Sequence, residues 1–346
     1  MQIYDGIVEA IGNTPLIKLR RASELTGCTI LGKAEFMNPG QSVKDRAGRQ
    51  MILEAEKRGE LQKGGLVVES TAGNTGIGLA LVANARGYRT LIVIPDTQSQ
   101  EKKDMLRLCG AELLEVPALP YSNPNNYQHV GRRLAEQLRK TEKNGVIFAD
   151  QWNNLDNRKA HYVSTGPEIW AQTDGKVDAF ICAIGTGGTI AGTSTYLRER
   201  KKDIVIGLAD PRGAAMYNFF AHGEVKASDG GSITEGIGLG RVTPIIEDIK
   251  VDKAYLVPDE EAIPIVFDLL EHEGLCLGGS SAINVAGAIR LARDIGPGKT
   301  IVTVLADNGN RYLSKLFNPQ FLRSKNLPVP AWLERKSGIT PPLEKV

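Results

Sequence analysis

The amino-acid sequence predicts an open α/β fold in which parallel strands alternate with helices. Short apolar runs alternate with longer amphipathic stretches along most of the 346 residues. Several of these runs are almost continuous Val, Ile and Leu, which is typical of parallel strands covered by helices on both faces. Successive strand–helix–strand units explain this alternation.

Each strand and helix is predicted from its hydrophobic pattern. The expected strands are Leu66–Glu69, Thr90–Ile94, Glu112–Val116, Val146–Ala149, Val177–Ile184, Ile204–Ala209, Ala254–Val257 and Thr300–Leu305. The expected helices are Lys44–Arg58, Thr75–Arg86, Ser99–Leu108, Tyr127–Glu142, Arg158–Thr173, Thr189–Arg200, Asp259–Glu273, Ser281–Asp294 and Arg311–Phe317. From residue 318 onward the chain is rich in Pro, Lys and Arg and has no long periodic pattern. This tail is expected to wrap around the surface or to contact a second subunit, with a disordered tail as the alternative.

Composition favours a globular enzyme over several other classes of protein. The net charge is only +2, which gives no reason to expect nucleic acid or an anionic membrane as a partner. The four cysteines are far apart without a C-x-x-C pair, and the four histidines show no metal-ligand spacing, so we expect reduced thiols and no metal site. The N-terminal residues carry no signal-peptide pattern, and no apolar run is long enough to span a bilayer. We therefore expect a cytoplasmic protein.

Lys44 lies where a helix is expected to begin, directly after the turn-forming sequence N-P-G-Q at residues 38–41. Ser42 is the expected N-cap, with Asp45 three residues later as a shortened capping box. The positive end of the helix dipole disfavours an ammonium group there, which favours an uncharged amine that forms an imine with a carbonyl. On this segment alone, an ordinary surface lysine at a helix start is the simpler interpretation.

A glycine-containing loop at residues 70–76 follows the first expected strand and opens the next helix. Backbone N–H groups at such a strand-to-helix turn bind anions. The loop lacks the lysine of a Walker motif, so a carboxylate suits it better than a triphosphate. Asn74 adds a side-chain amide that can donate to a ring hydroxyl or to a carboxylate.

A second loop, with the sequence G-T-G-G-T at residues 185–189, follows the expected strand Val177–Ile184. Its glycines allow close approach of the backbone, and its threonines add hydroxyl groups at a helix N-terminus, which is the composition of a phosphate site. A dinucleotide motif needs glycine where Ile190 stands, so a monophosphate fits better than a pyrophosphate. A glycine-rich turn without a ligand is the alternative.

Two further glycine-containing loops are candidates for the same site. The sequence G-G-S-S at residues 278–281 precedes an expected helix, where a plain serine cap is the alternative. The sequence E-G-I-G-L-G at residues 235–240 either lines the edge of a cofactor or forms an ordinary flexible turn. A reactive lysine, a carboxylate site, a monophosphate site and neutral hydroxyl loops together predict a site for pyridoxal 5′-phosphate (PLP).

The chain resembles the cysteine synthase (O-acetylserine sulfhydrylase) and cystathionine β-synthase family of fold-type II PLP enzymes, as a divergent branch. The resemblance runs from I-G-N-T-P-L at residues 11–16 to D-N-G-N-R-Y-L at residues 307–313, with the motifs in family order. It implies two open, twisted, mostly parallel sheets flanked by helices, as in the tryptophan synthase β-like fold. It further implies a smaller, mobile N-terminal domain (residues 1–14 and 38–150), a larger C-terminal domain (residues 15–37 and 151–320) and a tail (residues 321–346).

The resemblance also implies a role for each candidate site residue. Lys44 is the catalytic residue, which binds PLP as an imine and later moves the α-proton. The implied cofactor-binding residues are Lys44, Asn74 at the ring 3′ oxygen, Gly185, Thr186, Gly187, Gly188 and Thr189 at the phosphate, Gly236 near the ring, and Ser280 at the pyridine nitrogen. The implied substrate-binding residues are Thr71, Gly73, Asn74, Thr75 and Gln151. A neutral serine at the ring nitrogen favours expulsion of a β-substituent over transamination.

The reaction implied by the resemblance is β-replacement, in which O-acetyl-L-serine and sulfide give L-cysteine and acetate through an aminoacrylate intermediate. The alternatives are L-cysteine desulfhydrase activity, which releases sulfide, pyruvate and ammonia, and cystathionine β-synthase activity. A nucleotide-binding oxidoreductase is disfavoured by the glycine spacing of both loops, and a non-catalytic binding module by the presence of Lys44.

The resemblance implies a homodimer, and it raises serine acetyltransferase as a partner whose C-terminal tail docks in the active site of some cysteine synthases. The family pattern has serine where this chain has Ala72, so one hydroxyl donor to the substrate carboxylate is lost. The loops P-G-Q-S at residues 39–42 and L-G-G-S-S-A at residues 277–282 also differ from the family pattern. Together with Ala72, these differences make the serine acetyltransferase partnership doubtful for this protein.

Overall fold

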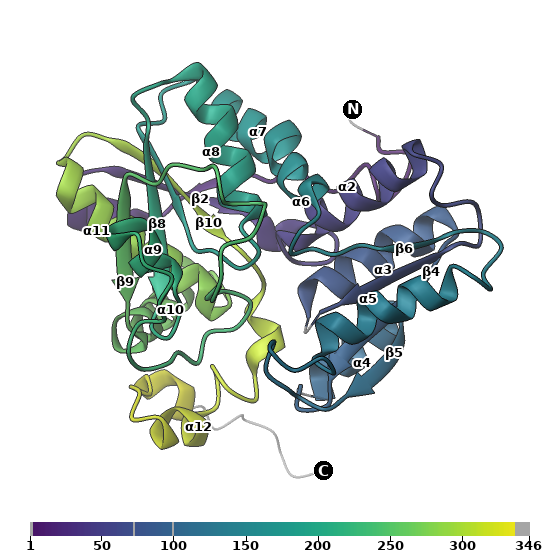
Figure 1. The fold of residues 1–346 in the computed structure, drawn as a ribbon. Helices are drawn as coiled ribbons and strands as arrows, with labels where there is room; N and C mark the ends of the chain where they lie inside the picture. The colour runs from purple at the N-terminus through teal and green to yellow at the C-terminus, as the bar shows by residue number, and fades with distance from the viewer. Residues whose placement is uncertain (1–2, 72, 99, 336–346) are drawn as a thin grey trace, which may run out of the picture.

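The computed structural model describes residues 3–71, 73–98 and 100–335 and contains two open sheets (Figure 1). The strands are β1 (Leu16–Lys18), β2 (Thr29–Ala34), β3 (Leu66–Ser70), β4 (Arg89–Pro95), β5 (Glu112–Val116), β6 (Val146–Phe148), β7 (Ala179–Cys182), β8 (Val205–Pro211), β9 (Lys253–Val257) and β10 (Thr300–Leu305). The larger sheet has the order β1-β2-β10-β7-β8-β9 and the smaller sheet the order β5-β4-β3-β6. Neighbouring strands are parallel except β1 and β2, which confirms the predicted fold class.

Helices cover both sheets on both faces. The helices are α1 (Arg20–Thr26), α2 (Lys44–Lys57), α3 (Asn74–Arg86), α4 (Gln100–Leu108), α5 (Tyr127–Leu138), α6 (Leu155–Ala160), α7 (Gly166–Gln172), α8 (Gly188–Arg200), α9 (Met216–His222), α10 (Asp259–Glu273), α11 (Gly279–Ile295) and α12 (Pro319–Ser324). In Figure 1 the smaller sheet with α3, α4 and α5 lies on the right, and the larger sheet with α8 and α11 lies on the left. None of the helices in the described part of the chain is long and apolar enough to cross a membrane.

The apolar strands are buried as their sequences predict. Every residue of β3 and of β7 is buried, because these strands lie inside their sheets. In β7 and β10, Ile181 and Ile301 join the core under α10 and α11, whereas Phe180 and Val302 join the core under α7 and α8. The edge strand β5 is largely exposed and carries glutamates, which discourage pairing with another chain.

Two predicted helices differ from the structure. The expected helix Arg158–Thr173 is divided into α6 and α7 by a π-helical turn at His161–Thr165, a feature that is frequent at functional sites. The expected helix Arg311–Phe317 is wrong: the chain forms only a 3₁₀ turn at Gly309–Tyr312. The Asn308 side chain caps this turn, and the side chains of Arg311 and Tyr312 form hydrogen bonds with site residues.

Several short elements were not predicted from the sequence, namely β1, β2, α1, α9 and α12. The tail contains α12 and a 3₁₀ turn at Ala331–Glu334. Leu322 and Leu327 of this tail are buried in the core of the larger sheet, with Trp332 packed against them. Through residue 335 the tail therefore wraps around the surface of this core; residues 336–346 lie outside the described residues.

The fold places the carboxyl ends of β3, β7 and β10 around the N-terminus of α2. Helix α2 packs against α3 on one side and against α6 on the other. Ligands of open α/β sheets bind at such carboxyl ends, so this junction is where a site is expected. The division into domains at residues 14/15, 37/38, 150/151 and 320/321 stays a prediction.

Candidate active site

A cavity of about 400 Å³ lies at the junction of the two sheets. Its lining includes the predicted site residues Lys44, Thr71, Gly73, Asn74, Thr75, Gln151, Gly185, Thr186 and Gly236. A smaller cavity of about 30 Å³ also borders Lys44, Gly185 and Thr186 and adds Gly187, Thr189 and Ser280. The two cavities thus bring together all the predicted site residues except Gly188, which begins α8 directly behind them.

Lys44 is the first residue of α2, and burial lowers the pKa of its amine, while Asp307 acts in the opposite direction. The expected capping box is wrong. The Ser42 hydroxyl accepts a hydrogen bond from the backbone N–H of Lys44 (3.3 Å) rather than from Asp45, and the Asp45 carboxylate accepts one from the N–H of Gly40. An amine whose charged form is disfavoured by burial is suited to nucleophilic attack and to proton transfer.

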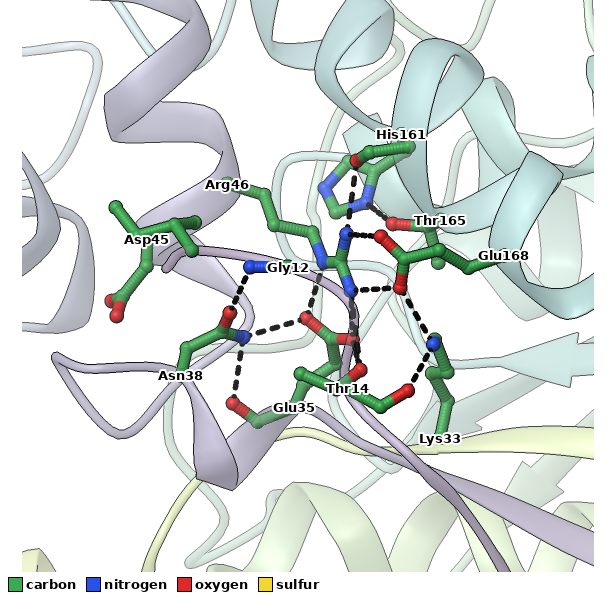
Figure 2. Close-up of polar contacts among 12 residues, drawn as sticks. Gly12, Thr14, Lys33, Glu35, Asn38, Asp45, Arg46, His161, Thr165 and Glu168 are labelled. Carbon is green, nitrogen blue, oxygen red and sulfur yellow. Dashed lines mark hydrogen bonds and ion pairs between the residues drawn. The ribbon is translucent and has the colours of Figure 1, made fainter. Parts of the chain in front are cut away.

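A buried network around Arg46 anchors the start of α2 (Figure 2). The Arg46 guanidinium donates to both oxygens of Glu35 (2.7 and 2.8 Å) and to both oxygens of Glu168 (2.7 Å each). Burial opposes ionisation of Glu35, but Arg46 outweighs it and lowers the pKa of the carboxyl to about 2. Since Glu35 follows β2 and Glu168 lies in α7, the network ties the helix of Lys44 to the larger sheet.

The loop after β3 lies against the larger cavity. The Thr75 hydroxyl donates to Oε1 of Gln151 (2.5 Å), which joins the start of α3 to the segment after β6. Within the described residues, the amide N–H groups of Asn74 and Thr75 have no hydrogen-bond acceptor, whereas that of Gly76 donates to the carbonyl of Gly73 (3.0 Å). Gly73 lines the cavity, and a Cβ added there would meet no protein atom within 4 Å. Ala72 lies outside the described residues.

The loop after β7 forms a backbone cup. Asn157 donates to the Thr186 hydroxyl (2.8 Å), and His161 contacts the Thr189 hydroxyl through Nε2 (3.3 Å). Burial lowers the pKa of His161 to about 3, so its ring is neutral. Within the described residues, the amide N–H groups of residues 185–187 have no hydrogen-bond acceptor. Unpaired amides at a helix N-terminus match a phosphate.

Ser280, in the first turn of α11, completes the smaller cavity. No Asp or Glu is among the described residues that line this cavity. A ligand nitrogen beside Ser280 would therefore meet a neutral hydroxyl. Asn284, one turn later, holds the surrounding backbone by accepting from the N–H of Ala183 and donating to the carbonyl of Val304.

Sequence reasoning missed two groups of residues at this site. Asp307, Arg311 and Tyr312 follow β10 and form hydrogen bonds around Asn74. Lys102 and Lys315 line the larger cavity and both pair with Glu235, with 2.6 Å between Lys315 and Glu235. The D-N-G-N-R-Y-L sequence and the glutamate before Gly236 are recognisable in the sequence. Their partners lie in distant segments, so the sequence does not show which residues they contact.

The residues present fit PLP. The site offers a lysine amine of lowered pKa, unpaired amides for a phosphate and a neutral hydroxyl for the ring nitrogen. Gly236 adopts a left-handed φ of 79°, and a Cβ added there would meet no protein atom within 4 Å, so the glycine leaves space along the cavity wall. PLP would be held by Lys44, the 185–189 cup and Ser280, with Asn74 beside the ring.

Comparisons with known proteins show the family of this chain. The model of the family "Pyridoxal-phosphate dependent enzyme" matches residues 7–307. Cysteine synthase 1 of Neurospora crassa is 52% identical over 329 residues, covering 94% of this chain and 86% of that protein. Cysteine synthase 1 of Emericella nidulans is 49% identical over 337 residues, covering 96% and 90%.

A solved structure shows the same fold. The O-acetylserine dependent cystathionine beta-synthase from Helicobacter pylori superposes with a TM-score of 0.80 at 32% identity, covering 91% of this chain and 99% of that one. The family model, the relatives and the fold agree with the resemblance that the sequence motifs indicate. The chain therefore belongs to the pyridoxal-phosphate dependent enzyme family, in the group that contains the cysteine synthases.

Proposed function

We propose that the protein is a cysteine synthase, which converts O-acetyl-L-serine and sulfide into L-cysteine and acetate. One observation carries the proposal: the amine of Lys44, whose pKa is lowered by burial, lines the same cavity as the anion-binding loop after β3. The cysteine synthases similar to this chain support the assignment of the reaction.

The loop at the start of α3 would bind the substrate carboxylate. Thr71, Asn74 and Thr75 border the cavity there, and the N–H groups of Asn74 and Thr75 have no acceptor among the described residues. The hydrogen bond between Thr75 and Gln151 fixes the start of α3 relative to the segment after β6. A carboxylate bound at this position orients the amino acid relative to Lys44.

Bound PLP supplies an electron sink that acidifies the α-proton of the amino acid and allows the β-substituent to leave. Lys44 would take the α-proton through Nζ, since burial favours its neutral, basic form. The 185–189 cup would hold the phosphate, and Ser280 would leave the ring nitrogen without a negative partner.

The ion pairs of Glu235 lie in the lining of the larger cavity. Lys102 comes from α4 beside the smaller sheet, whereas Glu235 and Lys315 come from segments of the larger-sheet side. We propose that these pairs hold the two sides together over the substrate and limit access of water to the reacting atoms.

A larger thiol is the second candidate for the attacking nucleophile. The Helicobacter pylori enzyme with the same fold is an O-acetylserine dependent cystathionine beta-synthase. In this chain Lys102 and Lys315 border the cavity, where an amino-acid thiol would bring a carboxylate. L-cysteine desulfhydrase activity is the remaining alternative within the same chemistry. The proposal also includes a homodimer and a cytoplasmic location.

The test is the visible absorption spectrum of the purified protein, recorded before and after addition of O-acetyl-L-serine and then of sulfide. We expect a cofactor band that changes lastingly with O-acetyl-L-serine and returns when sulfide is added, with L-cysteine as the product. A band that ignores O-acetyl-L-serine but responds to L-cysteine would transfer the assignment to the desulfhydrase reaction. Recovery by homocysteine but not by sulfide would favour cystathionine synthesis.

A further inference from the structure

The side-chain amide of Asn74 is held at both ends by residues that follow β10. Its Oδ1 accepts a hydrogen bond from Nη1 of Arg311, and its Nδ2 donates to Oδ2 of Asp307 (2.7 Å). Arg311 and Asp307 are 237 and 233 residues away in the sequence. Asn74 and Lys44 line the same cavity, so this network lies directly beside the predicted cofactor position.

The chemistry of the two partners decides which way the amide faces. Arginine only donates hydrogen bonds, and an ionised carboxylate only accepts them. A flipped Asn74 would set its N–H₂ against the guanidinium and its oxygen against the carboxylate, losing both hydrogen bonds at once. One N–H group of Nδ2 donates to Asp307, the Tyr312 hydroxyl interacts with the same Asn74 side chain, and Asn74 also lines the cavity.

The two partners are themselves fixed. Arg311 donates through Nη2 to the carbonyl of Gly40, in the turn that leads to Lys44. The Tyr312 hydroxyl donates to the same Asp307 oxygen as Asn74 (2.5 Å), and Asp307 is buried. One guanidinium therefore connects the residue beside the cofactor ring with the segment that carries the lysine.

We propose that Arg311, together with Asp307, is a positioning residue that orients the Asn74 amide so that its remaining N–H, and not its oxygen, faces the cofactor. This inference rests on the proposed contact between Asn74 and the 3′ oxygen of PLP. A donor in this place stabilises the ionised 3′ oxygen, because a hydrogen bond to a charged acceptor is stronger than one to a neutral acceptor. A flipped amide would present its oxygen and disfavour the ionised form.

The protonation state of the 3′ oxygen is visible in the absorption spectrum of the holoenzyme without any turnover. The ratio of the long-wavelength band (ionised oxygen) to the short-wavelength band (protonated oxygen) is measured across pH for the wild type, Arg311→Met, Asn74→Ala and the double variant. Arg323→Met, which removes an exposed ion pair with Glu334, is the matched control. Thermal unfolding and cofactor content are recorded for each protein.

We expect Arg311→Met and Asn74→Ala each to shift the ratio toward the protonated form by roughly tenfold, because a charge-assisted hydrogen bond is lost. Since Arg311 acts through Asn74, the double variant should shift no further than the larger single effect. Arg323→Met should leave the ratio unchanged. If Arg311→Met does not fold, Arg311→Lys replaces it, since it keeps the charge but cannot bridge Asn74 and Gly40.

Two results would overturn this inference and leave the proposed function intact. One is a shift of the band ratio in Asn74→Ala without a shift in Arg311→Met; the other is a double variant in which the two single shifts add in full. An unchanged ratio in Asn74→Ala would instead remove the proposed contact between Asn74 and the cofactor, and the inference with it. A loss of stability in Arg311→Met with an unchanged ratio would assign the residue a structural role only and overturn its positioning role.

Discussion

Arg46 and Glu168 form a bidentate ion pair, in which both terminal nitrogens of the guanidinium donate to the carboxylate at a distance of 2.7 Å each. The pair joins α2, which begins with Lys44, to α7 on the larger-sheet side. Arg46 is buried and also bonds both oxygens of Glu35, so its charge is neutralised in place. One guanidinium therefore ties the helix that begins with Lys44 to the larger-sheet side.

Replacing Arg46 with lysine is expected to lower the free energy of unfolding by about 3–5 kcal/mol, because an ammonium cannot serve two buried carboxylates with fork geometry. Denaturant unfolding of the holoenzyme measures this loss. Arg86→Lys is the control, since Arg86 pairs with Glu56 nearer the surface and should cost less than about 1 kcal/mol. Equal losses in the two variants would contradict the anchoring role.

Replacing Lys44 with alanine is expected to reduce turnover at least about a hundredfold, because the group proposed to move the α-proton is lost. The backbone cup at residues 185–189 remains, so PLP should still bind, although not covalently. Steady-state kinetics and mass spectrometry after borohydride reduction check the two statements. Lys57→Ala, at the other end of α2, is the control and should keep both activity and covalent attachment. Normal turnover in Lys44→Ala would refute the proposed mechanism.

Replacing Glu235 with glutamine is expected to raise KM for O-acetyl-L-serine by about three- to tenfold, because its ion pairs with Lys102 and Lys315 in the cavity lining are weakened. Burial lowers the pKa of Lys102 to about 8, so the wild-type pairing should also weaken as the pH rises past 8. KM is measured against pH for both proteins. Glu260→Gln, whose partner Arg212 is exposed, should behave like the wild type.

Replacing Asp210 with asparagine is expected to stabilise the protein at high pH. Burial raises the pKa of the Asp210 carboxyl from 3.8 to about 7. At pH values between these two, the carboxyl is protonated in the native state and ionised in the unfolded state. Wild-type stability contributed by this group is therefore present below about pH 4 and declines as the pH rises to about 7. Denaturant unfolding at about pH 5 and about pH 8 should show a smaller decline in Asp210→Asn. The exposed Asp229→Asn serves as control, and an identical decline in all three proteins would contradict the prediction.

Local patterns predicted much of the fold. The helix Asp259–Glu273 and the strands Glu112–Val116 and Thr300–Leu305 have the predicted bounds. All three segments have a clear hydrophobic pattern of their own. The helix also has acidic residues in its first turn and a glycine directly after its end. The expected helix Arg311–Phe317 failed because the contacts of Arg311 and Tyr312 with distant residues override its local helical pattern.

The sequence by itself determined which groups border the cavities: a lysine at a helix start, glycine-containing loops at two strand-to-helix turns and the hydroxyl of Ser280. These features are local, since strand-to-helix turns and their glycines act within a few residues. Only the tertiary structure decided which side chains support them. Asn74 meets Asp307 and Arg311, and Arg46 meets Glu168, because strands from two sheets end at one junction. Contacts across more than a hundred residues leave no periodic trace in the chain, so packing alone brings them together.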